Sequence, residues 1–277
     1  MSDPLPLGIH FGIHDEVYRA DPGVAQSSLK YARTSMNHVR CSIDGEMRPR
    51  KSKATEIGTA IHLRVMQPDE FRKRIVLAPD GYDGRTKEGK AWAAANVADG
   101  QDILNYEDGK RVTGMYDRLM DHPVFRAAVE QCNFEVTLIH MANTPKGEIR
   151  IKGRPDIVPH EGRCICDLKK TTLGTAHQDV WGKDIAKWGY HIQAAYYLDL
   201  FNAVTGSERT AFIHFAVEED PPHEIGCYQI DDEAVSIGRM FYQDALLRYA
   251  ECVQTGVWPG YSETPIKISL PPWAKQM

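Results

Sequence analysis

Apolar and polar positions alternate in two neighbouring segments near the middle of the chain. Residues 148–158 and 163–169 show the period of two that is typical of β-strands, and the turn-forming sequence His160-Glu-Gly-Arg163 lies between them. The pattern therefore predicts a β-hairpin. Residues two apart share one face of a strand, so Asp167 and Lys169 should point the same way, with Asp156 close to them across the hairpin.

The rest of the chain alternates between helical and strand patterns. Helices are predicted over residues 27–39, 55–66, 90–98, 108–120, 124–131, 176–203 and 231–255, and further strands over residues 134–141, 210–217 and 224–230. Thr55 is a candidate cap of the second helix, which Pro68 should end, and residues 1–21 are expected to form an irregular leader. The order predicts an α/β (α+β) fold with a central mixed sheet flanked by helices.

Composition narrows the class of protein. The chain has 277 residues, 42% hydrophobic and 26% charged, which fits one soluble globular domain. Within it we distinguish a mainly helical part (1–131), a sheet with helices (132–230) and a C-terminal helix and tail (231–277). A net charge of −5 and a pI near 6.1 argue against a generic nucleic-acid coat, although clustered metal-binding acids would also lower the total.

Targeting signals and cysteine spacing suggest a cytoplasmic location. There is no signal peptide pattern and no apolar run of membrane-spanning length. The six cysteines contain no C-x-x-C pair, so we expect reduced thiols and neither an iron–sulfur cluster nor a structural zinc.

The predicted hairpin carries candidate metal chemistry. Two converging carboxylates, Asp156 and Asp167, suit a hard divalent cation such as Mg²⁺, and Lys169 beside them could act on a water or on an attacked phosphate. An ordinary hairpin with surface charges is the alternative. Gln193 and Tyr197 lie four residues apart on a predicted helix and therefore share a face, although a core tyrosine beside an amide would give the same pattern.

Together these motifs resemble a known family. Gly153-x-x-Asp156, Asp167-x-Lys169 and Gln193-x-x-x-Tyr197 are similar to the PD-(D/E)xK nuclease superfamily, in its RecB-like and phage-recombination exonuclease branch. Ile57-Gly-Thr-Ala-Ile-His62, the following segment to Phe71, Arg85 to Lys90 and the tail from Ser269 to Lys275 resemble RecE-type (exonuclease VIII) nuclease domains. The resemblance runs from about Val24 to the C-terminus and implies a restriction-endonuclease-like core with an N-terminal helical extension.

The resemblance implies the roles of individual residues. It places two Mg²⁺ or Mn²⁺ ions on His62, Glu135, Asp156, Asp167 and the Leu168 backbone carbonyl, with Lys169 assisting the attacking water and Gln193 and Tyr197 in an accessory role. A lone helical histidine is more often structural, and Glu135 also fits an exposed strand position, so both alternatives stay open.

Candidate DNA contacts surround the predicted His62 helix. Basic residues precede it (Arg48, Arg50, Lys51 and Lys53) and follow it (72–74), and Ser27 and Ser28 at the start of a predicted helix could receive a 5′-phosphate. A solvated basic loop and simple helix capping are the alternatives.

The implied activity is metal-dependent 5′-to-3′ degradation of one strand of linear double-stranded DNA. The resemblance adds a ring-shaped homo-oligomer (trimer or tetramer), 3′ single-stranded tails used by an annealing protein of the RecT type in recombination, and a phage origin. A same-fold endonuclease and a non-catalytic module that binds DNA ends and recruits an annealing protein remain as alternatives.

Overall fold

Helices and strands follow one another from Gly8 to Thr255. The computed structural model describes residues 3–47, 52–271 and 274. The helices are α1 (Asp15–Ala20), α2 (Gln26–Leu29), the 3₁₀ helix η1 (Lys30–Arg33), α3 (Met36–Ile43), α4 (Lys53–Met66), α5 (Pro68–Arg74), α6 (Lys87–Asn96), α7 (Tyr106–Asp121), α8 (Pro123–Glu130), α9 (Gln178–Trp188), α10 (Tyr190–Thr205) and α11 (Asp232–Thr255). The strands are β1 (Gly8–His10), β2 (Val24–Ala25), β3 (Ile75–Leu77), β4 (Asp102–Leu104), β5 (Cys132–Phe134), β6 (Thr137–Thr144), β7 (Gly147–Gly153), β8 (Ile157–Pro159), β9 (Cys164–Thr171), β10 (Ala211–Glu218) and β11 (Ile225–Gln229).

The strands form two main sheets and one small one. The larger sheet has the order β11-β10-β9-β8-β5, the second has the order β1-β6-β7-β2, and β3 pairs with β4. β9 and β10 are parallel while β8 and β9 are antiparallel, so the larger sheet is mixed. The predicted mixed α/β class is confirmed, but the strands are divided between separate sheets and do not all join the one central sheet that the sequence pattern predicts.

The chain crosses between the two main sheets at two points. The strand predicted over residues 134–141 is split after Phe134, and the strand predicted over 148–158 is split after Gly153. Pro155 has no backbone N–H and restricts the residue before it, which explains the second break. At the first break Glu135 has a φ of +48°, a left-handed conformation that costs a non-glycine residue roughly 1–3 kcal/mol. The predicted alternating-strand setting of Glu135 is therefore wrong.

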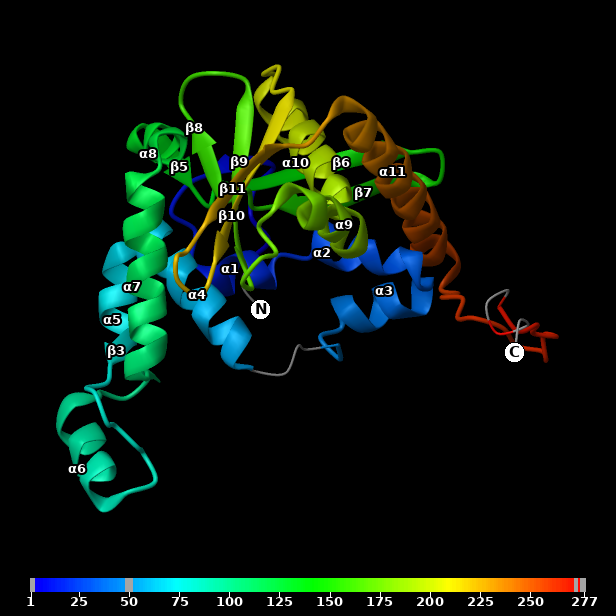
Figure 1. Cartoon of the computed structure of the whole chain (residues 1–277). Helices are drawn as coiled ribbons and strands as arrows, with labels where there is room; N and C mark the ends of the chain where they lie inside the picture. The colour runs from blue at the N-terminus through cyan, green and yellow to red at the C-terminus, as the bar shows by residue number, and fades with distance from the viewer. Residues whose placement is uncertain (1–2, 48–51, 272–273, 275–277) are drawn as a thin grey trace.

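Both faces of the larger sheet are covered by helices. Cys166, Leu168 and Phe215 pack with residues of α4, α7 and α8 on one face, whereas Ile165 and Phe212 belong to the apolar cluster formed with α10 and α11. Figure 1 shows the two groups of helices on opposite sides of the sheet, with α6 projecting from the lower end of the molecule. Because side chains alternate along β9, Asp167 and Lys169 lie on the α10 side.

Helix boundaries follow local capping chemistry. α4 begins two residues before the predicted start because Ser52 is its N-cap. Thr55 is therefore not the N-cap that the sequence suggested, but it completes a reciprocal capping box with Ser52. The helix predicted over 27–39 is broken into α2, η1 and α3, and the one predicted over 176–203 is divided by Gly189, which adopts a left-handed φ of +73°.

The N-terminal residues pack on the second sheet. β1 pairs with β6, and the buried Asp21 accepts hydrogen bonds from Arg150 at 2.6 and 3.0 Å. The ammonium of Lys152 donates to the Asp21 carbonyl at 2.6 Å. The prediction of an irregular leader is therefore wrong. This segment is ordered by long-range strand pairing and by buried charged contacts, and such interactions leave no apolar period in the sequence.

Candidate active site

Asp156, Asp167 and Lys169 meet where the chain enters the larger sheet. The Leu168 amide on β9 donates to Asp156 Oδ2 at 3.2 Å, which ties the segment before β8 to β9. Asp167 is 1% exposed, and its Oδ2 forms an ion pair with the Lys169 ammonium. The expectation that Asp167 and Lys169 share a face and lie near Asp156 matches this arrangement.

The charges of this cluster perturb one another. Burial, followed by repulsion from Asp167, holds the pKa of the Asp156 carboxyl well above its ordinary value of 3.8. Burial opposes a charged Lys169, but Asp167 and Asp156 outweigh it, and the pKa of Lys169 lies above its ordinary value of 10.5. The site therefore holds two mutually repelling carboxyl groups and a protonated lysine.

His62 approaches this cluster from α4, which packs on the face of the larger sheet opposite to α10. Its Nδ1 lies 3.7 Å from Asp156 Oδ2, and the backbone of Leu168 also lies near its ring. Burial and then the charge of Lys169 lower the pKa of His62 to about 4, so the imidazole is neutral at pH 7. A neutral imidazole is the form that binds metal ions.

Glu135 is tied to the cluster through its backbone, and its side chain contacts Gln67, a residue that the sequence motifs did not indicate. Its amide donates to the Asp156 carbonyl at 2.9 Å, so both residues are fixed at the crossing between the sheets. Its Oε2 accepts a hydrogen bond from Gln67, at the junction of α4 and α5. Gln67 comes five residues after His62, but a single glutamine in a helix-ending segment carries no distinctive pattern.

The accessory helix α10 contacts the site directly. Gln193 Nε2 donates to Asp167 Oδ1 at 2.9 Å. Tyr197 lies one turn further along α10, and burial raises its pKa well above 10. Tyr190, at the start of α10, places its ring 4.9 Å from the Lys169 ammonium. The aromatic contact of Tyr190 was not foreseen, since nothing in its spacing connects it to Lys169.

The donor set suits a divalent cation. In the part of the chain that the structure describes, no three His, Cys, Asp or Glu side chains form a ready coordination group. The chemistry nevertheless fits, because the buried Asp167 Oδ2 is paired with the Lys169 ammonium and the proximity of Asp167 raises the pKa of Asp156. A cation bound by carboxylate oxygens would relieve that repulsion.

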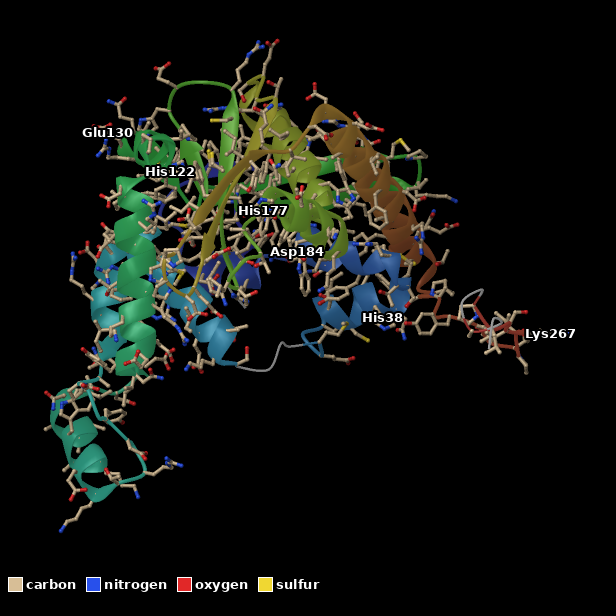
Figure 2. All side chains as sticks on the ribbon, viewed as in Figure 1. His38, His122, Glu130, His177, Asp184 and Lys267 are labelled. Carbon is tan, nitrogen blue, oxygen red and sulfur yellow. The ribbon has the colours of Figure 1, made fainter. Side chains whose placement is uncertain are left out.

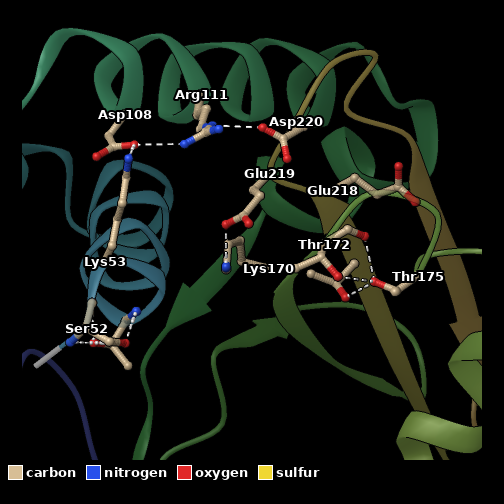
Figure 3. A network of polar contacts seen from close by, with 12 residues as sticks. Ser52, Lys53, Asp108, Arg111, Lys170, Thr172, Thr175, Glu218, Glu219 and Asp220 are labelled. Atoms are coloured by element: carbon tan, nitrogen blue, oxygen red, sulfur yellow. Dashed lines mark hydrogen bonds and ion pairs between the residues drawn. The ribbon is translucent and has the colours of Figure 1, made fainter. Parts of the chain in front are cut away.

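A second polar network lies on the opposite face of β9 and supports α4. Lys170, next to Lys169, pairs with Glu219 at 2.5 Å. The buried Asp108 of α7 pairs with Lys53 at 3.1 Å and with Arg111 at 3.0 Å (Figure 3). Arg111 in turn donates to Asp220 at 2.8 Å, so α4, α7 and the turn after β10 are joined by charge.

The predicted DNA contacts are placed only in part. Arg48, Arg50 and Lys51 lie outside the described residues. Lys53 is 59% exposed at its side chain but pairs with Asp108. Ser28 bonds to Ser42 at 3.0 Å, and neither Ser27 nor Ser28 caps α2, whose N-cap is Ala25, so the capping interpretation of these serines is wrong.

The three histidines labelled in Figure 2, His38, His122 and His177, have local structural partners. His122 and His177 cap α8 and α9, and His38 bonds to Ser35 Oγ at 2.7 Å. Figure 2 shows these residues on separate elements, well apart from one another. They therefore do not converge on a common site.

These features define a restriction-endonuclease-like nuclease fold with the PD-(D/E)xK residues gathered at one place. Residues 25–266 match the model of the PDDEXK-like domain of unknown function, DUF3799, and the chain belongs to that family. The prediction of a PD-(D/E)xK nuclease domain is thus confirmed. The metal-binding and catalytic roles of the individual residues stay predictions.

Solved structures support the fold. The chain resembles the crystal structure of a candidate exonuclease from Eubacterium rectale, with a TM-score of 0.64 and 16% identity over 96% of this chain and 99% of that chain. At that identity the likeness shows the fold alone. The crystal structure of SSO0001 aligns with a TM-score of only 0.36 and 13% identity, over 82% of this chain and 76% of that one, and carries no argument. No curated protein matches the sequence.

Among the described helices, none is both long enough and apolar enough to cross a membrane.

Proposed function

We propose that this chain is a divalent-metal-dependent exodeoxyribonuclease that degrades one strand of linear double-stranded DNA from 5′ to 3′. The observation that carries the proposal is the convergence of Asp156, Asp167, Lys169 and His62, with Gln193 bonded to Asp167. The PDDEXK-like family supports phosphodiester hydrolysis. The 5′-to-3′ polarity rests on the RecE-type resemblance alone. Exonuclease activity also agrees with the name of the similarly folded candidate exonuclease from Eubacterium rectale.

The residues divide the chemistry among them. Mg²⁺ or Mn²⁺ would be held by Asp156, Asp167, Glu135, neutral His62 and the Leu168 carbonyl. Oxygen donors suit these hard cations, and the set contains no thiolate that would favour a softer metal. A bound divalent cation supplies Lewis-acid stabilisation of the phosphate and lowers the pKa of the attacking water. Asp167 is oriented by the Gln193 amide, so its second oxygen faces Lys169.

Lys169 acts as a cation in this scheme. Its raised pKa keeps it protonated at pH 7, so its ammonium can donate to the attacked phosphate and stabilise the negative charge that develops there. The Tyr190 ring behind it restricts where the ammonium can go. Lys169 therefore serves as an electrostatic stabiliser in this proposal.

The test is digestion of duplex DNA labelled at the 5′ or the 3′ end, beside a closed circle, with Mg²⁺ or EDTA. Metal-dependent release of 5′-terminal nucleotides from linear DNA alone is expected. Cutting of the circle would replace the proposal with an endonuclease, and end binding without digestion would replace it with a recruiting module.

Adjacent lysines give a matched pair of variants. Lys169→Met should fold and lose most digestion, whereas Lys170→Met, which alters the opposite face of β9, should keep it. Asp167→Ala should bind DNA ends but not digest them. Equal turnover by Lys169→Met and the parent would contradict the assigned role of the lysine.

The proposal extends to partners through the resemblance. A ring-shaped homo-oligomer, trimer or tetramer, would encircle linear double-stranded DNA, and an annealing protein of the RecT type would receive the 3′ tails. Light scattering of the purified protein tests the first, and co-purification with an annealing protein tests the second. A monomeric mass would exclude the ring.

A further inference from the structure

A buried histidine with unused polar atoms lies directly behind the catalytic cluster. His214, on β10, is 0% exposed, and neither of its ring nitrogens has a hydrogen-bond partner among the described residues. Trp181 Nε1 shares this property. His214 is the register partner of Asp167 in the parallel pair of β9 and β10, and the Trp181 ring lies 5.7 Å from the His214 ring.

The two ring nitrogens of His214, buried without hydrogen bonds, destabilise the folded protein. A neutral imidazole carries one N–H donor and one acceptor nitrogen, and a buried polar group without a partner costs about 1–3 kcal/mol. A phenylalanine at position 214 would fill a similar volume without that penalty. Departures of this kind from local packing rules concentrate at functional sites.

The contacts of His214 connect it to both members of the Asp167–Lys169 ion pair. Its ring meets the Tyr190 ring edge-on, with 5.2 Å between the centroids, and the Lys169 ammonium lies 4.9 Å from the centroid of the same Tyr190 ring. Phe212 packs against the same imidazole at 5.5 Å. His214 therefore supports Lys169 through Tyr190 and stands beside Asp167 across the strand pair.

We propose that His214 is a positioning residue that donates a ring N–H to Asp167 Oδ2 when Lys169 leaves that oxygen to meet the substrate. The inference rests on the proposed function, since it requires Asp167 to serve as a metal ligand. Carboxylates that bind metal ions are usually held by a supporting hydrogen bond. Gln193 provides that bond at Oδ1, and His214 is the neighbouring buried donor for Oδ2.

Two substitutions separate the imidazole nitrogen from aromatic packing. His214→Phe keeps a ring among Tyr190, Trp181 and Phe212 but removes the donor, whereas His214→Gln retains an N–H. Isothermal titration of the DNA-free protein with Mg²⁺ and Mn²⁺ gives the affinity, and thermal unfolding at pH 8 monitors the fold. We expect His214→Phe to unfold no earlier than the parent and to bind metal roughly 10–100-fold more weakly. His214→Gln should recover part of that loss.

The outcomes distinguish this inference from the proposed function. Metal binding by His214→Phe within twofold of the parent, or no recovery in His214→Gln, would overturn the role of His214 alone. A parent protein that binds neither metal would overturn the proposed function and this inference with it.

A measurement on the parent protein covers the case in which His214→Phe does not fold. In protein labelled with ¹⁵N-histidine, addition of Mg²⁺ should shift the His214 ring nitrogens toward values of a hydrogen-bonded N–H. Unchanged His214 resonances at saturating metal would overturn the inference.

Discussion

A methyl group added at Gly153 should push the accessory helix away from the catalytic strand. Gly153 ends β7 and is the glycine of the Gly-x-x-Asp156 motif. A Cβ at this position would lie 2.7 Å from Leu200 Cδ2 and 3.2 Å from Tyr197 Cε1, both on α10. Carbon atoms prefer separations of about 3.5–4.0 Å, so Gly153→Ala creates two overlaps with the helix that carries Gln193.

The size of the effect follows from burial. Leu200 is 2% exposed and has little room to move. Overpacking of this kind costs roughly 1–3 kcal/mol, and replacing a strand glycine by alanine returns about 0.5–1 kcal/mol. We expect Gly153→Ala to lower the free energy of unfolding by about 1–2 kcal/mol, which corresponds to a fall in Tm of a few degrees.

Digestion should fall by more than stability. A shift of α10 disturbs the Gln193 bond to Asp167, and misplacement of supporting groups by ~1 Å can cost ~100-fold in rate. Urea unfolding and digestion of linear DNA are measured on Gly153→Ala and on Gly153→Ala with Leu200→Ala, which opens space for the methyl group. Full stability and turnover in the single variant would refute the close approach of β7 and α10.

Three further predictions test other parts of the site. A Cβ added at Gly58 on α4 would meet no atom within 4 Å, so Gly58→Ala should raise the free energy of unfolding by ~1 kcal/mol. A raised KM for DNA in this variant would show that DNA passes over this face of α4, and an unchanged KM would exclude it. Asp156→Asn should abolish digestion but raise the Tm of the metal-free protein at pH 8. The pKa of Asp156 lies above its ordinary value, so ionisation of this carboxyl disfavours folding. An unchanged or lower Tm would contradict the pKa shift. Burial lowers the pKa of His214 from 6.5 to about 4, so the unfolded chain takes up a proton first and stability should fall as pH drops from 6.5 toward 4, by up to about 3 kcal/mol. Urea unfolding across that range should give a shallower fall in His214→Phe, and parallel curves would count against this explanation.

Elements with strong periodicity were predictable from the sequence. α7, α8, β9, β10 and α11 lie within two residues of their predicted bounds, because their apolar residues recur at the helix or strand period and pack in the core. The motif residues of the site were predictable for a related reason. Asp167 and Lys169 are fixed by strand alternation, and Gln193 and Tyr197 by helical spacing.

Long-range relations were not predictable from the same patterns. Alternation marks a strand but does not say which sheet it joins, so the crossings at Glu135 and Arg154 were missed. The contact of Tyr190 with Lys169 and the pairing of Lys53 with Asp108 join residues that are distant in sequence and carry no common spacing. Such contacts depend on the final packing of helices on the sheet.

The N-terminal residues have a consequence for how the protein behaves when they are removed. The family match begins at residue 25, yet β1 covers the free side of β6 at Thr137, Leu138 and Ile139. A chain shortened to the family boundary would expose that edge, with its unpaired N–H and C=O groups, to strands of other molecules. It would also leave Arg150 without the Asp21 carboxylate. Such a shortened protein should self-associate through β6, even with every residue of the nuclease site in place.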